Sequence, residues 1–128
     1  MLSRTAENYL RTIYEVIEKK GYVRVKDIAD ALDVRASSTI EMLEKLNEEQ
    51  FILYEKRGGI TLTENGKRTA ETINARYKVF LRLFEFAGVS PKTAYKDACS
   101  LEHYVSDETN KSIQALVETL EKSGFRRP

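Results

Sequence analysis

Apolar residues recur at steps of three and four along the first part of the chain. Such spacing is typical of an amphipathic helix. Ser3 is suited to cap its start, and Gly21 ends the pattern after Lys19 and Lys20. We therefore predict a first helix between Ser3 and Gly21, with an apolar stripe of Ala6, Tyr9, Leu10, Ile13, Tyr14 and Ile17.

Two short helices joined by a tight turn are predicted next. Residues 22–25 resemble a short β-stretch, and residues 26–32 have the pattern of a helix, followed by a turn at Asp33 and Val34. A third helix is expected to be capped by Ser37 or Ser38, because residues 38–41 match a capping box. Its apolar face would consist of Ile40, Leu43 and Leu46. This arrangement is typical of a helix-turn-helix.

A β-hairpin is expected after these helices. Residues 51–55 and 60–63 are rich in β-forming side chains, and residues 56–59 between them contain two glycines. Lys56 and Arg57 would lie at the turn. A helix-turn-helix followed by a basic hairpin is a winged helix, so we assign residues 1–70 to a winged helix-turn-helix DNA-binding domain.

The remainder of the chain is predicted to be helical. A long helix should run from Glu64 to about Phe86, a second should start at Ser90–Pro91 and reach about Val105, and a last should open at Ser106 and end near Gly124. The long helix carries more apolar side chains than a solvent-exposed helix normally has. We therefore predict that this surface is buried, partly against a partner. Residues 71–128 are therefore expected to form a helical dimerisation and metal-binding domain. The fold class is mainly α with a small β-hairpin.

Composition excludes several classes of protein. The 128 residues are 41% hydrophobic and 32% charged, an ordinary globular balance. No apolar run approaches the roughly 20 residues of a membrane span, and no signal peptide is apparent. A single cysteine, Cys99, allows no internal disulfide. We expect a cytoplasmic protein.

Net charge alone does not indicate nucleic-acid binding. Residues 20–68 carry nine basic and nine acidic side chains, so DNA binding depends on where the cations lie. The start of the recognition helix would present the side chains that reach DNA, and Lys26, Lys56 and Arg57 would contact phosphates. The alternative is that the serines only cap the helix and that the cations are solvated. The predicted helix contacts are Arg35, Ser37, Ser38, Thr39 and Glu41.

One group of residues suggests metal binding. Cys99, Glu102 and His103 are spaced i, i+3 and i+4, which places them on one face of a helix. Thiolate, carboxylate and imidazole together suit Fe²⁺, Co²⁺, Ni²⁺ or Zn²⁺. The alternatives are chance proximity and an enzymatic Cys–His pair, although no oxyanion site or third orienting residue is visible. We therefore expect no catalytic residue and no enzyme.

Several segments resemble a known family. Residues 9–15 and 97–103, followed by 106–108, are similar to the diphtheria toxin repressor, and residues 25–32 and 54–58 to its shorter branch, the manganese transport regulators. The similarity covers nearly the whole chain in order. It implies a short form without the SH3-like third domain.

The resemblance implies a homodimeric repressor of metal homeostasis genes, which binds double-stranded operator DNA when loaded with Fe²⁺ or Mn²⁺. By position, DNA contacts fall on Arg35, Ser37, Ser38 and Glu41, and the metal site on Cys99, Glu102, His103 and Asn8. Asn8 offers a neutral amide where relatives have a thioether or a carboxylate.

A second metal site is not expected. Arg11 stands where the manganese branch has a ligating glutamate, and an arginine cannot ligate a cation. Tyr77, Leu81 and Tyr95 stand where the iron branch has ligands. We predict one ion per subunit, Fe²⁺ or alternatively Mn²⁺, Co²⁺, Ni²⁺ or Zn²⁺, with no membrane or small-molecule substrate. Two other functions remain open: a metal-independent DNA-binding regulator, and a winged helix used only for protein contacts.

Overall fold

The computed structural model describes residues 2–57 and 59–126. The chain divides into two compact units, Met1–Thr72 and Ile73–Pro128, here called the N-terminal and C-terminal units. Among the residues described, no helix has both the length and the apolar character needed to span a bilayer.

The first helix, α1, spans Arg4–Lys20 and confirms the predicted limits. Ser3 Oγ accepts a hydrogen bond from the Ala6 N–H at 3.1 Å, which satisfies one of the open donors at the helix start. Gly21 ends the helix in the left-handed conformation, with φ 84°. A residue without Cβ takes this conformation without strain, so local sequence signals are sufficient to set both ends.

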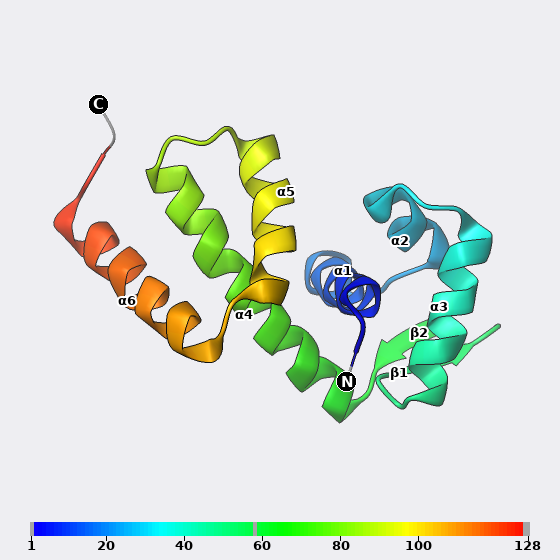
Figure 1. Cartoon of the computed structure of the whole chain (residues 1–128). Coiled ribbons are helices and arrows are strands. Elements are labelled where there is room, and N and C mark those ends of the chain that lie inside the picture. The colour runs from blue at the N-terminus through cyan, green and yellow to red at the C-terminus, as the bar shows by residue number, and fades with distance from the viewer. Residues whose placement is uncertain (1, 58, 127–128) are drawn as a thin grey trace. The chain divides into compact units, whose positions relative to one another are not determined.

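Helices α2 (Val25–Leu32) and α3 (Ala36–Glu48) form the predicted helix-turn-helix (Figure 1). Between them, the N–H of Val34 reaches back to the carbonyl of Ala29 at 3.0 Å, closing the C-terminus of α2. The expected β-stretch at residues 22–25 is wrong, because Val25 already belongs to α2. The Asp27 carboxylate accepts the N–H of Arg24 at 2.9 Å, so the chain caps a helix there instead.

The predicted cap of α3 is also wrong. Arg35 is the N-cap residue, and Ser37 and Ser38 lie inside the first turn. Starting at Ala36 turns Thr39 toward the core together with Leu43 and Leu46, the buried residues of this helix. Burial of this face therefore decides where the helix begins, and the capping preference of serine does not.

The hairpin is confirmed. Strands β1 (Ile52–Glu55) and β2 (Gly59–Leu62) pair antiparallel, with Ile52 opposite Leu62. Ile52 and Ile60 point to the buried side, and both are at most 6% exposed. Alternating side chains thus fasten the hairpin to the core of the N-terminal unit.

Helix α4 (Glu64–Phe86) follows the hairpin directly. Thr63 Oγ1 accepts the N–H of Gly66 at 3.0 Å and also donates to the Phe51 carbonyl. A Cβ atom on Gly66 would lie 1.7 Å from that same carbonyl oxygen. The entry to α4 therefore requires glycine at position 66, although glycine is otherwise a poor helix former.

The C-terminal unit holds the rest of α4 with α5 (Pro91–Leu101), the short 3₁₀ helix η1 (Glu102–Tyr104) and α6 (Asp107–Ser123). Tyr77, Phe80 and Ala98 form a buried cluster. The apolar stripe of α4 is thus largely covered by the unit's own core. Further apolar side chains pack against this cluster, namely Leu81, Leu83, Phe84, Cys99, Val105 and Ile113. Within the described residues, the predicted mainly α fold with one small hairpin is confirmed.

Candidate functional site

The start of α3 presents an exposed polar face. Arg35, Ser37, Ser38 and Glu41 are all exposed, and the serines are the second and third residues of the helix. The unpaired backbone N–H groups at a helix N-terminus favour an anion such as a phosphate. These four side chains can therefore approach DNA without any change in the fold.

Thr39 does not belong to this face. Its side chain is 0% exposed, and its hydroxyl donates to the Arg35 carbonyl at 3.1 Å. The expectation that Thr39 contacts DNA is corrected, because its hydroxyl is used inside the unit. The error follows from the misplaced helix start: a helix that begins at Ala36 turns position 39 inward.

The hairpin and the start of α2 carry further cations. Lys56 and Arg57 lie exposed in the turn between the strands, and Lys26 is exposed on α2. Gly58 lies outside the described residues. Long cationic side chains at these positions are suited to contact phosphate oxygens.

A groove of about 610 Å³ lies within the N-terminal unit, between the end of α1 and the hairpin. Arg24, Arg57 and Lys67 contribute positive charge to its wall, while Glu18 contributes the opposing charge. Tyr22 also lines the groove, with the Arg24 guanidinium 5.2 Å from its ring centre. Three of the nine basic residues in 20–68 therefore line one groove beside the hairpin.

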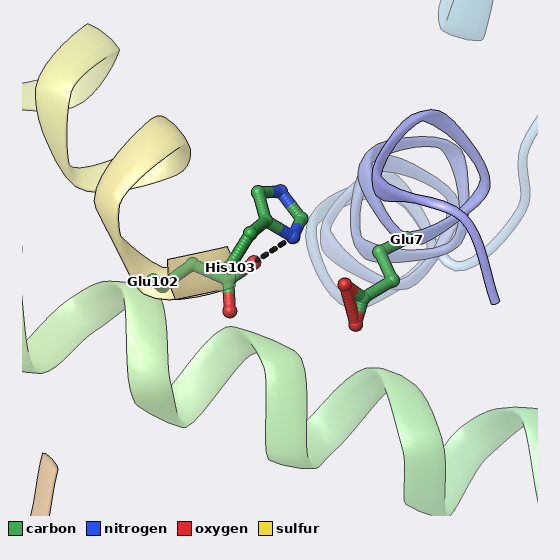
Figure 2. A group of neighbouring side chains, drawn as sticks. All are labelled: Glu7, Glu102 and His103. Carbon is green, nitrogen blue, oxygen red and sulfur yellow. Dashed lines mark ion pairs between the residues drawn. The ribbon is translucent and has the colours of Figure 1, made fainter. Parts of the chain in front are cut away.

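Two potential metal ligands meet at η1. Oε1 of Glu102 lies 3.2 Å from Nδ1 of His103 (Figure 2), and both side chains are nearly inaccessible, 2% and 5% exposed. A carboxylate and an imidazole are donors for borderline divalent ions. The pair can therefore offer one oxygen and one nitrogen donor to a divalent cation.

Cys99 lies apart from this pair. In the part of the chain that the structure describes, Sγ of Cys99, a Glu102 oxygen and a His103 nitrogen do not all lie within 4.8 Å of one another. Helix α5 ends at Leu101, and Glu102 and His103 belong to η1. Cys99 is half-buried and packs against the Tyr77 cluster. The predicted ligand set of Cys99, Glu102 and His103 therefore stays a prediction.

Helix α1 carries the other predicted ligand. Asn8 is half-buried, and so is the preceding residue Glu7, whose carboxylate is drawn in Figure 2. Asn8 therefore stays a predicted ligand, since its side chain is not fully enclosed by the N-terminal unit.

Charge and packing surround the positions at which the sequence predicts no second metal ion. Arg11 is 2% exposed, and its Nη1 lies 3.1 Å from Oε1 of Glu15. Tyr77 and Tyr95 stack edge to face with ring centres 5.7 Å apart, and Leu81 packs against the buried cluster that contains Tyr77. Aromatic and aliphatic packing thus accounts for these three side chains.

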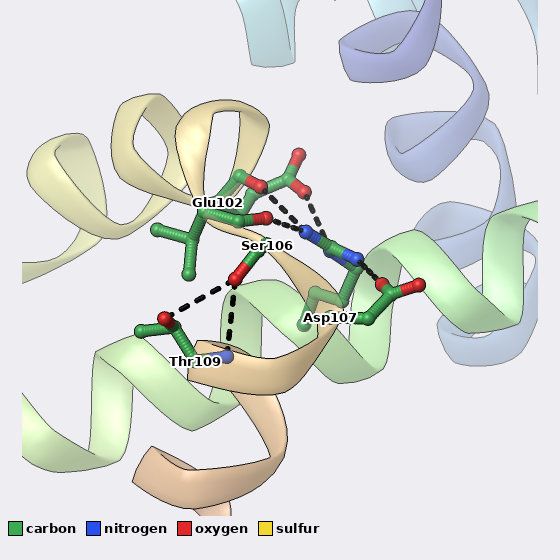
Figure 3. Close-up of polar contacts among 6 residues, drawn as sticks. Glu102, Ser106, Asp107 and Thr109 are labelled. Atoms are coloured by element: carbon green, nitrogen blue, oxygen red, sulfur yellow. Dashed lines mark hydrogen bonds and ion pairs between the residues drawn. The ribbon is translucent and has the colours of Figure 1, made fainter.

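One residue near Glu102 was not foreseen. Arg76 of α4 lies with Nε 3.8 Å from Oε2 of Glu102, and its Nη1 pairs with the Asp107 carboxylate. Nη2 donates to the backbone carbonyls of Glu102, at 3.3 Å, and Val105. Figure 3 shows these contacts beside the Ser106 cap of α6. No spacing rule links residues 26 to 31 positions apart, so the sequence pattern had no signal for this network.

Comparison with protein families matches the chain in two parts. Residues 1–60 match the N-terminal DNA-binding domain of iron-dependent repressors. Residues 63–128 match the metal-binding and dimerisation domain of the same repressors. Together the matches cover nearly the whole chain in the order expected from the sequence.

Solved structures give the same picture. A manganese-dependent transcriptional repressor in complex with manganese is 30% identical, with a TM-score of 0.77 over 88% of this chain and 52% of its own. The manganese regulator SloR is 28% identical, with a TM-score of 0.76 over 88% and 53%. IdeR of T. acidophilum is 25% identical, with a TM-score of 0.75 over 97% and 56%. This chain therefore spans about half the length of these three structures.

Proposed function

Because the chain belongs to the iron-dependent repressor family, we propose that it is a transcriptional repressor whose affinity for operator DNA rises when a divalent metal ion binds. The observation that carries the proposal is the buried Glu102–His103 pair in a chain whose other unit is a winged helix. The family consists of transcriptional regulators, so we assign no catalytic residue.

We propose that α3 reads the major groove and that the hairpin contacts the DNA backbone. Arg35 would contact a guanine or a phosphate, and Ser37 and Ser38 would contribute hydroxyl and backbone donors. Glu41 would repel phosphate and favour a cytosine amine. Exposure of these side chains supports the assignment. The backbone contacts would come from Lys26, Lys56 and Arg57.

Glu102 and His103 are the ligands we propose with the strongest structural support. We propose Cys99 as a further ligand, whose Sγ would move toward Glu102 and His103 when an ion binds. From α1 we propose Asn8 as a further ligand. A bound ion would supply the positive charge that balances the carboxylates. The ligands set its identity by offering nitrogen, oxygen and sulfur donors.

We propose one ion per subunit. The donor set favours Fe²⁺, with Co²⁺, Ni²⁺ and Zn²⁺ as chemical alternatives. A related repressor was solved with manganese and another with Zn²⁺, so Mn²⁺ stays in the test set. The packing of Tyr77, Leu81 and Tyr95 supports a single site.

We propose that residues 1–70 are the DNA-binding domain. We propose that the repressor forms a homodimer through residues 71–128. Tyr104 is 71% exposed and Leu101 is 37% exposed. Both line an apolar hollow of about 380 Å³ together with Phe84. Exposed apolar surface of this kind indicates a protein interface. Two recognition helices would then meet operator half-sites in the cytoplasm, about one helical turn apart or a multiple of it.

A DNA-binding titration tests the proposal. DNA fragments selected in vitro by the metal-loaded protein are titrated with the full chain, anaerobically, with and without Fe²⁺ or Co²⁺. We expect metal to raise the affinity for the selected sequence and His103→Ala to remove that increase. Lys96→Ala, an exposed change on α5, is the matched control.

A metal-independent DNA-binding regulator is the second candidate, favoured by the separation of Cys99 from Glu102 and His103 and by the neutral amide of Asn8. It predicts equal DNA affinity with and without metal, and no effect of Cys99→Ala or His103→Ala. A full chain that selects no DNA sequence, with or without metal, would contradict both candidates and favour a role in protein contacts.

A further inference from the structure

The two oxygens of the Glu102 carboxylate have different neighbours. Oε1 lies 3.2 Å from Nδ1 of His103, and Oε2 lies 3.8 Å from Nε of Arg76. The side chain is 2% exposed, so water does little to screen the carboxylate. One oxygen therefore faces the proposed ligand partner and the other faces a permanent cation.

Arg76 also holds the backbone around Glu102. Its Nη2 donates to the carbonyl of Glu102 at 3.3 Å and to that of Val105. Carbonyls at the end of a helix have no partner inside the helix, and here a side chain from α4 supplies the donor. Nη1 pairs with Asp107 in the first turn of α6. One guanidinium thus spans the bend from η1 to α6.

We propose that Arg76 is a positioning residue for Glu102: it occupies the Oε2 side of the carboxylate and leaves Oε1 for a metal ion, so that Glu102 ligates through one oxygen. The proposal rests on the metal site proposed above. An arginine cannot itself be a ligand, because all its nitrogens are donors. Groups that hold a metal ligand from behind orient it before the ion arrives.

The geometry calls for arginine in particular. A guanidinium is planar and presents donors in several fixed directions, whereas a lysine ammonium is a single flexible point. Arg76 uses Nε toward the carboxylate, Nη1 toward Asp107 and Nη2 toward the two carbonyls. Lysine would keep the charge and lose most of this simultaneous contact, so we expect it to restore metal binding only in part.

Helix α4 also contains a matched control. Arg82 is 45% exposed, with Nη1 3.1 Å from Glu85 and Nε 3.6 Å from Glu121. It therefore makes surface ion pairs in the same unit and touches no proposed ligand. Removing Arg82 reports the effect of losing an arginine from α4 without any effect on Glu102.

The test measures Co²⁺ affinity of the full chain by anaerobic calorimetry, without DNA, for wild type, Arg76→Ala, Arg76→Lys, Arg82→Ala and Glu102→Gln. We expect Arg76→Ala to weaken Co²⁺ binding by about 10- to 100-fold, the usual effect of losing a group that supports a ligand. Arg76→Lys should be intermediate and Arg82→Ala unchanged. Amide hydrogen exchange of the metal-free protein should rise at residues 102–107 in Arg76→Ala.

The outcomes separate the two proposals. Equal Co²⁺ affinity of wild type and Glu102→Gln would overturn the metal site itself. Loss of affinity in Glu102→Gln combined with wild-type affinity in Arg76→Ala would overturn only the positioning role. If Arg76→Ala does not fold, the folded Arg76→Lys variant decides: weakened Co²⁺ binding supports the role of Arg76, and wild-type binding overturns it.

Discussion

The two units place their proposed functional residues in opposite surroundings. In the N-terminal unit, Arg35, Ser37 and Ser38 are exposed, while Leu43 and Leu46 behind them form the core. In the C-terminal unit, Glu102 is almost fully buried and takes part in the contacts that hold η1 to α4. In the N-terminal unit, different residues thus serve stability and the proposed function. In the C-terminal unit, the same residue serves both.

This difference follows from what each unit would bind. DNA is a large external ligand, so the side chains that meet it must be exposed, and surface changes have little effect on folding. A metal ion needs its hydration shell replaced by protein donors. Those donors must be held in place before the ion arrives, which requires burial and support from neighbouring segments.

Gly66→Ala should have the largest effect on stability. Gly66 belongs to the N-terminal unit but is distant in sequence from the residues on α3 that are proposed to contact DNA. Alanine normally favours a helix over glycine, but here its Cβ would lie 1.7 Å from the Phe51 carbonyl oxygen. We expect a loss of about 3 kcal/mol in the free energy of unfolding, as for severe overpacking. Urea denaturation measures it, with Asn65→Ala, an exposed neighbour in the same turn, as control. If Gly66→Ala lowered the free energy of unfolding as little as Asn65→Ala does, this explanation of how α4 begins would be wrong.

Glu102→Ala should destabilise the protein in the absence of metal. Removing one member of a buried ion pair costs about 3–5 kcal/mol. Because Arg76 is 22% exposed and partly screened, we expect about 2 kcal/mol. Denaturation in the presence of a chelator gives the value, and Glu85→Ala, whose partner is the exposed Arg82, should change stability far less. Equal stability of Glu102→Ala and wild type would contradict the proposal that Glu102 serves both stability and function. The proposed difference between the two units would then be wrong.

Arg35→Ala should weaken DNA binding without weakening the fold. We expect a loss of at least about 1 kcal/mol in the free energy of binding to selected DNA. The free energy of unfolding should stay within about 0.5 kcal/mol of wild type, since Arg35 is exposed. Fluorescence anisotropy and denaturation are measured on the same sample. Destabilisation as large as the loss of DNA affinity would break the proposed separation of roles in the N-terminal unit.

Asp27→Asn should have the smallest effect, visible mainly through pH. A hydrogen bond from Lys20 and then one from the Arg24 N–H hold the pKa of the Asp27 carboxyl below its ordinary value. A carboxyl with a lowered pKa stabilises the fold at neutral pH, and this contribution is lost as pH falls from about 4 through the lowered pKa. The stability difference between wild type and Asp27→Asn should therefore shrink in acid. Asp30→Asn, exposed on the same helix, should show no such convergence.

Elements with local signals were predicted well. Ser3 and Gly21 delimit α1, Ser90 and Pro91 open α5, and Ser106 opens α6. The hairpin was likewise located from its β-forming residues and its glycine-containing turn. Each of these signals acts over a few residues, so neighbouring residues were sufficient evidence.

The candidate site was predicted only in part. Glu102 and His103 lie close together, and the assignment of Cys99 as a further ligand stays a prediction. Thr39 was predicted to contact DNA, but it is buried, because packing in the core sets the start of α3 at Ala36. Arg76 was not anticipated, because its partners lie a full helix away in sequence.

By itself, then, the sequence determined the family, the order of the elements and most helix ends, because caps, turns and periodicity are local properties. Only the tertiary structure decided which face of α3 is buried, where α5 ends and η1 begins, and which cation pairs with Glu102. Those features depend on packing between segments distant in the chain, where burial outweighs the local preference of any single residue.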